Sequence, residues 1–263
     1  MKKNLIWSLY QANTLWMDID GNLKNIETVI KKSKSFDADI LVCPEVCTTA
    51  YATKNPEIAQ TMDSFMIDRL LSMAKKYQLA ICGSFMIQEN GKLYNRFIWF
   101  SADGEIFKYD KAHLFSLADE NIYFTRGSNT ITISYQGWEI RPYICYDIRF
   151  PVWNRNKKTD NKFDYDILVY VSNWPTKRYY HWKHLLIARA IENQAYVIGV
   201  NRVGKDGNGF EYSGGTMCID PAGSVVLEAK QDENIFIVNT YYDHLTKIRE
   251  KLPFSSDWDN FKI

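Results

Sequence analysis

Two stretches of this sequence, Asp39-Ile40-Leu41-Val42 and Asp166-Ile167-Leu168-Val169, consist of the same four residues. Each is a short apolar run of the kind that forms a buried strand, and Pro44 ends the first one. Four matching residues alone are weak evidence of a duplication. Around them, however, both halves of the chain alternate strand-like apolar runs with helical patterns. The sequence therefore predicts an α/β fold in which each half supplies a sheet with helices on one side, stacked as a layered sandwich.

The spacing of apolar residues predicts the elements around these two stretches. Helices are expected from Asp20, taken as an N-cap, to about residue 33, over 57–76 and over 180–194. The polar stretch 154–162 is expected to be a surface loop, and no linker divides the chain, so residues 1–263 are predicted to form one domain. The expected strands are 5–10, 39–43, 79–86, 93–100, 106–109, 130–134, 139–144, 166–169, 197–203, 216–219, 225–228 and 235–239.

Composition excludes several classes of protein. The chain has 263 residues, of which 46 % are hydrophobic and 24 % charged, and its formal net charge is only +1. A dedicated nucleic-acid or membrane-surface binder would need a basic excess on one face, so neither partner is predicted. The N-terminal apolar run is too short for a signal peptide, and no apolar stretch of about 18 residues occurs. Five scattered cysteines without a C-x2-C pair predict no metal site and a cytoplasmic protein with reduced thiols.

Three candidate functional residues directly follow predicted strands, where an α/β sheet presents side chains to a crevice. Glu45 could serve as a general base, although a strand-terminal Glu often simply faces water. Lys111 lies among aromatic residues and could stabilise an oxyanion, or it could be an ordinary surface lysine. Cys145 resembles a nucleophile on a strand-to-helix turn, whose amides would lower the pKa of its thiol; the alternative is an inert buried cysteine.

These residues lie in motifs that resemble those of the nitrilase, or carbon–nitrogen hydrolase, superfamily. The resemblance runs from the first strand to about residue 240. Each motif by itself is weak evidence for the family, but the occurrence of all of them in the same order along the chain is strong evidence. It implies a Glu-Lys-Cys triad on a four-layer α-β-β-α sandwich of two mixed sheets flanked by helices. Members often have a second glutamate that positions the lysine, and Glu120 matches that position best. The motifs are Pro44-Glu45, Tyr109-Asp110-Lys111-Ala112-His113-Leu114-Phe115, Cys145-Tyr146-Asp147-Ile148-Arg149-Phe150-Pro151, Ser172-Asn173-Trp174-Pro175, Ala188-Arg189-Ala190-Ile191-Glu192-Asn193 and Asp220-Pro221-Ala222-Gly223.

The resemblance implies hydrolysis of an amide through a thioester. Cys145 would attack the carbonyl carbon while Glu45 takes its proton, and Lys111 with the backbone N–H of Tyr146 would hold the oxyanion. No metal or organic cofactor is implied. A Cys–His arrangement like that of a protease is the mechanistic alternative, but His113, two residues from Lys111, is interpreted as a packed or hydrogen-bonded neighbour.

Within the superfamily the nucleophile motif, Asn173-Trp174-Pro175 and Asn201-Arg202-Val203-Gly204 are similar to the ω-amidase branch, which acts on 2-oxoglutaramate and 2-oxosuccinamate. Such a substrate carries a carboxylate, so a cation is expected in its pocket. Arg149 and Arg202 are the candidates, and a structural ion pair with an acid such as Asp147 or Glu192 is the alternative role for each. The other predicted substrate contacts are Tyr146, Phe115, Trp174 and His181.

Two other functions stay open. The first is another amidase of the superfamily, acting on deaminated glutathione or an N-carbamoyl compound. The second is a non-catalytic interaction protein, which would have no physical need for all three triad residues. The resemblance also implies a homodimer, and the aromatic-rich tail, about 243–263, could lie at its interface or fold back on its own domain.

Overall fold

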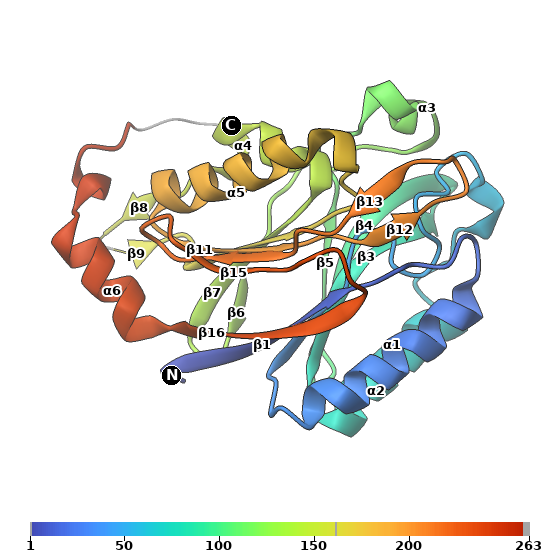
Figure 1. The fold of residues 1–263 in the computed structure, drawn as a ribbon, viewed down its shortest axis with the longest axis horizontal. Helices are drawn as coiled ribbons and strands as arrows, with labels where there is room; N and C mark the ends of the chain where they lie inside the picture. The colour runs from blue at the N-terminus through green and yellow to red at the C-terminus, as the bar shows by residue number, and fades with distance from the viewer. Residues whose placement is uncertain (1, 161, 260–263) are drawn as a thin grey trace.

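The computed structural model describes residues 2–160 and 162–259. Two six-stranded mixed sheets lie face to face, with helices on their outer faces, as predicted (Figure 1). The strand order in the first sheet is β16 (Asn234–Tyr241), β1 (Asn4–Gln11), β2 (Ile40–Val42), β3 (Ala80–Glu89), β4 (Lys92–Phe100) and β5 (Ile106–Asp110). In the second sheet it is β15 (Val225–Glu228), β14 (Met217–Ile219), β11 (Tyr196–Val200), β10 (Ile167–Val171), β7 (Trp138–Ile144) and β6 (Ile133–Tyr135).

The repeated tetrapeptide occupies equivalent places in the two sheets. β2 runs parallel to β1 and β3, and β10 runs parallel to β7 and β11. Every residue of β2 and β10 is buried, which is why both read as continuous apolar runs without alternation. The carboxyl ends of these parallel strands lead into the loops that carry the candidate site.

Helices cover the outer face of each sheet (Figure 1). α1 (Ile19–Lys34) and α2 (Phe65–Tyr77) cover the first sheet, and α5 (Tyr179–Asn193) covers the second. Between the sheets, large side chains such as Trp7, Trp99 and Tyr143 are fully buried. Burial of each such side chain contributes about 1.5–3 kcal/mol, so this central layer supplies much of the stability. The remaining elements are α3 (Glu120–Tyr123), α4 (Pro151–Asn154), α6 (Tyr242–Lys251), β8 (Lys158–Thr159), β9 (Lys162–Phe163), β12 (Val203–Lys205) and β13 (Glu211–Ser213).

Two predicted helix starts are wrong. α1 begins at Ile19 because the side chain of Asp18, not Asp20, accepts the N–H of Gly21 at 2.9 Å. The helix predicted over 57–76 starts only at Phe65. Pro56–Ile58 forms only a 3-10 turn, and Gln60 then exchanges backbone hydrogen bonds with Met86 and Gln88 beside β3.

The stretch 154–162 is also more than the surface loop predicted from its polarity. Asn154 and Asn156 are buried, and their side-chain amides donate to backbone carbonyls, among them Asp147 O and Tyr165 O. Lys158–Thr159 forms the short strand β8. Residue 161 lies outside the described residues.

The C-terminal tail folds back on its own chain as far as it is described. α6 is anchored by Arg249, whose guanidinium donates to Asp166 at 2.7 Å. Trp258 packs edge-on against Phe163 and under the guanidinium of Arg155, 4.4 Å from its ring centre. Residues 260–263 of the predicted interface segment, Phe261 included, lie outside the described residues. Among the helices described, none combines the length and apolarity that crossing a membrane requires.

Candidate active site

A pocket of about 390 Å³ opens where loops after β2, β5, β7 and β10 meet. Of the residues predicted from the sequence, Cys145, Tyr146, Arg149, Phe115 and Trp174 line it. Glu45, Lys111 and Glu120 are all at most 1 % exposed. The fold thus brings the three predicted strand ends together, although they lie far apart in the sequence.

Lys111 stands between the two glutamates. Its Nζ lies 2.9 Å from Glu45 Oε1 and 3.0 and 2.8 Å from Glu120 Oε1 and Oε2. Burial by itself would lower the pKa of Lys111, but the charges of Glu120 and Glu45 outweigh burial and raise the pKa above its ordinary value. The lysine is therefore held protonated, as an oxyanion stabiliser must be.

Both carboxylates are oriented by further donors. Asn95 Nδ2 donates to Glu45 Oε1 at 2.8 Å and to Glu120 Oε1 at 3.1 Å. The backbone N–H of Asn173 donates to Glu45 Oε2, and that of Phe115 donates to Glu120 Oε2. A buried charge is tolerated only with such partners, so the two glutamates are held in defined positions.

The backbone is strained beside the first and third strand ends. Val46, which follows Glu45, has φ +40° and Cys145 has φ +43°. Positive φ is rare for residues other than glycine and rarer for a β-branched one, so the surrounding structure must impose it. Val46 N–H donates to Ser84 Oγ at 2.8 Å, which holds the first loop against β3. Cys145 opens the one-turn 3-10 helix Cys145–Arg149, a tight strand-to-helix turn that turns its side chain toward the pocket.

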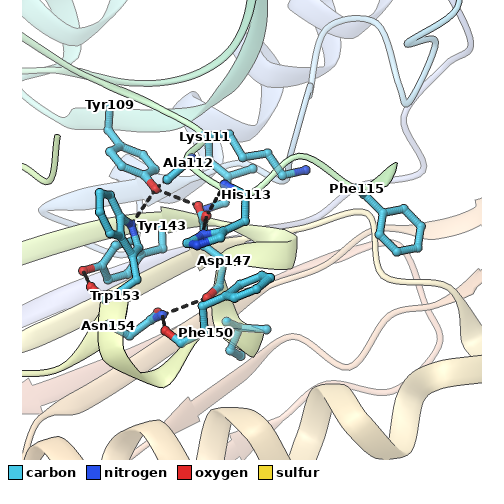
Figure 2. Close-up of polar contacts among 12 residues, drawn as sticks. Tyr109, Lys111, Ala112, His113, Phe115, Tyr143, Asp147, Phe150, Trp153 and Asn154 are labelled. Atoms are coloured by element: carbon cyan, nitrogen blue, oxygen red, sulfur yellow. Dashed lines mark hydrogen bonds and ion pairs between the residues drawn. The ribbon is translucent and has the colours of Figure 1, made fainter. Parts of the chain in front are cut away.

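Asp147 joins the lysine segment to the cysteine turn (Figure 2). Its carboxylate accepts from Tyr109 Oη at 2.8 Å, from His113 N–H at 3.0 Å and from Ile144 N–H at 3.1 Å. The ring Nδ1 of His113 also lies 2.8 Å from it, and the ring stacks on Phe150. His113 is therefore the hydrogen-bonded neighbour that the sequence predicted, committed to Asp147 and not placed as a base.

The prediction of a lowered thiol pKa for Cys145 is wrong. Burial, followed by the charge of Glu45, raises the pKa of Cys145 well above its ordinary value, and the charge of Lys111 only partly opposes them. The resting residue is a thiol, because a thiolate there would lose solvation and face the carboxylate of Glu45. Chemistry at Cys145 therefore requires that its proton be taken as the bond to carbon forms.

The predicted carboxylate ligands differ in their positions. Arg149 lines the pocket with its guanidinium 4.7 Å from the centre of the Trp174 ring, and no carboxylate of the described residues forms an ion pair with it. The prediction that Arg202 binds substrate is contradicted, because Arg202 is fully buried and donates to the carbonyls of Thr14 and Val203. A backbone-bound arginine in the protein interior cannot reach a ligand.

His181, also predicted as a substrate contact, is exposed and lies outside the set of residues that line the pocket. Its Nδ1 lies 3.1 Å from Arg149 Nη2, so it orients the guanidinium instead. Three residues of the site were missed: Asn95, Tyr51 and Arg178. Tyr51 and Arg178 line the pocket, and Asn95 bridges the glutamates. No pattern in the sequence marks them, since each reaches the site through tertiary packing.

Among the residues that the structure describes, no group of three or more His, Cys, Asp or Glu is arranged to hold a metal ion. The arrangement can instead do acid–base and nucleophilic chemistry. It combines a thiol, a carboxylate that can move its proton, and a fixed ammonium near the same pocket.

Comparisons with known proteins find relatives along almost the whole chain. The sequence model of one family, described as carbon-nitrogen hydrolase, matches residues 8–249. The chain is 37 % identical to the omega-amidase YafV of Escherichia coli, with 97 % of each chain covered. It is also 37 % identical to the 2-oxoglutaramate amidase of Bacillus subtilis over 90 % of each chain. Among solved structures it is similar to XC1258 of Xanthomonas campestris, a CN-hydrolase superfamily protein with an arsenic adduct in its active site, with a TM-score of 0.97, 33 % identity and full coverage of both chains.

Proposed function

The chain belongs to the carbon–nitrogen hydrolase family, and on that premise we propose that it releases ammonia from the ω-amide of a small 2-oxo dicarboxylic acid monoamide, such as 2-oxoglutaramate or 2-oxosuccinamate. It is an amide-hydrolysing enzyme of the ω-amidase type. The observation that carries the proposal is the Glu45–Lys111–Glu120 cluster, buried next to a pocket that contains Cys145 and a guanidinium without an acidic partner.

The first half of the reaction forms a thioester. Cys145 Sγ attacks the amide carbon while its proton passes to Glu45, so no free thiolate has to exist in the resting enzyme. The oxygen becomes negative and is held by the Lys111 ammonium and the backbone N–H of Tyr146. When the C–N bond breaks, Glu45 returns the proton to the nitrogen and ammonia leaves.

The second half hydrolyses the thioester. Glu45 takes a proton from water as the oxygen attacks the acyl carbon, and the same two donors hold the second oxyanion. The C–S bond then breaks, the sulfur regains the proton from Glu45, and the carboxylic acid product is released. Glu120 acts throughout as a positioning residue, because its two oxygens hold Lys111 Nζ within 3.0 Å.

The pocket suits the other end of this substrate class. Trp174 and Phe115 supply apolar walls, and Arg149 supplies a cation for the carboxylate. Carbon–nitrogen hydrolases that act on deaminated glutathione or N-carbamoyl compounds would use the same triad. Assays with several amide substrates are therefore needed to distinguish an ω-amidase from these enzymes.

We also propose that the enzyme works in the cytoplasm as a homodimer. Its five cysteines are all free, which suits a reducing compartment. Large apolar side chains such as Val226 and Tyr241 are 52 % and 53 % exposed on strands β15 and β16, which suits burial by a second copy.

The test is ammonia release from 2-oxoglutaramate, glutamine, asparagine and an N-carbamoyl amino acid by the wild type, Cys145→Ala and Cys218→Ala. Cys218 is a fully buried cysteine in β14 and serves as the matched control. Release from the 2-oxo amide that Cys145→Ala abolishes and Cys218→Ala retains would support the proposal. Activity confined to the N-carbamoyl compound would reassign the substrate. If no amide released ammonia, the result would favour a non-catalytic interaction protein.

A further inference from the structure

Two guanidiniums line the pocket from different segments of the chain. Arg149 comes from the turn after β7, and Arg178 comes from the 3-10 turn Thr176–Arg178 that precedes α5. Each is stacked on an aromatic wall: Arg149 lies 4.7 Å from the ring centre of Trp174, and Arg178 lies 5.3 Å from that of Phe115. Stacking holds both planar groups in place while leaving their N–H donors at the edges.

The charges in the pocket do not balance. Its lining has four charged side chains, of which Lys54 and Asp119 neutralise each other in an ion pair of 2.8 Å. Within the described part of the chain, neither Arg149 nor Arg178 forms an ion pair with a carboxylate. Arg149 donates only to His181, and the guanidinium of Arg178 donates to no described residue.

Two like charges lining one small pocket repel each other unless an anion lies between them. The pKa of Arg149 is lowered, mainly by burial; Tyr146 opposes this shift, and the charge of Arg178 adds to it, which reflects the repulsion. Deeper in the site, the ammonium of Lys111 pairs with the carboxylates of Glu45 and Glu120, and the single negative charge left on this buried cluster offsets only one of the two positive charges at the wall. The arrangement favours a ligand that brings negative charge and several acceptor oxygens.

We propose that Arg149 and Arg178 together bind the end of the substrate remote from the scissile amide and thereby select 2-oxo acid amides over α-amino acid amides. The inference rests on the proposed function and names the residues that set its specificity. A 2-oxo acid offers the carboxylate and the adjacent keto oxygen, enough acceptors for both guanidiniums. Glutamine carries an ammonium at the same carbon, and that charge is repelled by both arginines.

The test compares 2-oxoglutaramate, glutamine and glutaramate, which has the carboxylate but neither keto group nor ammonium. Ammonia release gives kcat and KM for the wild type, Arg178→Met, Arg178→Glu and Lys177→Met. Lys177 is exposed on the same turn and does not line the pocket, so Lys177→Met removes one positive charge nearby without touching the site.

Arg178→Met is expected to lower kcat/KM for 2-oxoglutaramate roughly 10- to 100-fold, mainly through KM, because one charge-assisted contact is lost. The value for glutamine should stay the same or rise, so the preference for the 2-oxo amide falls at least 10-fold, and further in Arg178→Glu. Lys177→Met should retain the wild-type preference. An equal loss for all three substrates in Arg178→Met, or no loss, would overturn the proposal.

A binding measurement separates this inference from the proposed function. Calorimetry with 2-oxoglutarate and glutamate, which keep the two headgroups but have no amide, needs no turnover. If the wild type hydrolyses no amide, the proposed function fails. The inference that Arg149 and Arg178 select a 2-oxo acid headgroup is then still supported if the wild type binds 2-oxoglutarate more tightly than glutamate and Arg178→Met loses that difference. It fails if the two ligands bind alike.

Discussion

Replacement of Asp147 by asparagine tests how the fold joins the segments that carry Lys111 and Cys145. The Asp147 carboxylate lies between the segment that carries Lys111 and the turn that carries Cys145, and it is fully buried. Oδ1 accepts from the backbone and the ring of His113, and Oδ2 accepts from Tyr109 Oη and the N–H of Ile144. Asparagine fills the same space but has only one accepting oxygen.

The cost follows from these four contacts. The least harmful orientation points the new NH₂ group at His113, because the ring can change tautomer and accept from it. The His113 backbone N–H then loses its partner, at about 1.5–3 kcal/mol. The two bonds to the remaining oxygen lose the carboxylate charge and weaken by about 0.5–1 kcal/mol each. Together the free energy of unfolding should fall by about 2.5–5 kcal/mol.

Urea unfolding and steady-state kinetics of the same preparation measure the two consequences. Because the Lys111 and Cys145 segments are no longer tied together, kcat should fall about 100-fold at temperatures where the variant remains folded. Asp220→Asn is the matched control. Asp220 is also buried and accepts from Ala222 and Ser224 in the turn after β14, but it lines no part of the pocket. It should lose stability and keep its kcat.

Two results would refute this reasoning. A loss of less than about 1 kcal/mol in Asp147→Asn would mean that the contacts contribute little net free energy. A kcat within twofold of the wild type would mean that the two segments keep their positions without the carboxylate, and Asp147 would then have no positioning role.

Three further outcomes are expected. Alkylation of Cys145 by iodoacetamide should become faster with rising pH up to pH 9 without a plateau, because the raised pKa of the thiol leaves the thiolate a minor species there. A plateau of the rate near pH 7 would contradict the conclusion that burial and the charge of Glu45 raise this pKa. Arg96→Met should lower the unfolding free energy by about 2–3 kcal/mol in urea titrations, since buried Arg96 binds Asp110 through two parallel hydrogen bonds; an unchanged midpoint would count against it. Gly127→Ala should lower the free energy of unfolding by about 1–3 kcal/mol and also lower kcat/KM, because the new Cβ would lie 2.1 Å from Asp110 O, next to Lys111. Unchanged stability and activity in this variant would show that the backbone yields without cost.

Much of the architecture could be predicted because its signals are local. Strand periodicity, turn residues and the repeated apolar tetrapeptide depend on near neighbours, so β2 and β10 were predicted correctly as buried strands, one in each sheet. The failures at residues 57–64 and 154–156 share one cause. In each stretch a residue, Gln60 in the first and Asn156 in the second, makes hydrogen bonds with a distant part of the chain, which no local pattern records.

The site divides in the same way. The positions of the glutamate, lysine and cysteine follow from local pattern, since each comes directly after a strand whose carboxyl end faces the crevice. Tertiary packing selects the arginine that reaches the pocket: Arg149 stacks on Trp174, whereas Arg202 donates to the carbonyl of Thr14, 188 residues away in the chain. It also decided the protonation of Cys145, because desolvation and the charge of a neighbouring carboxylate are properties of packed space and not of the sequence around the thiol.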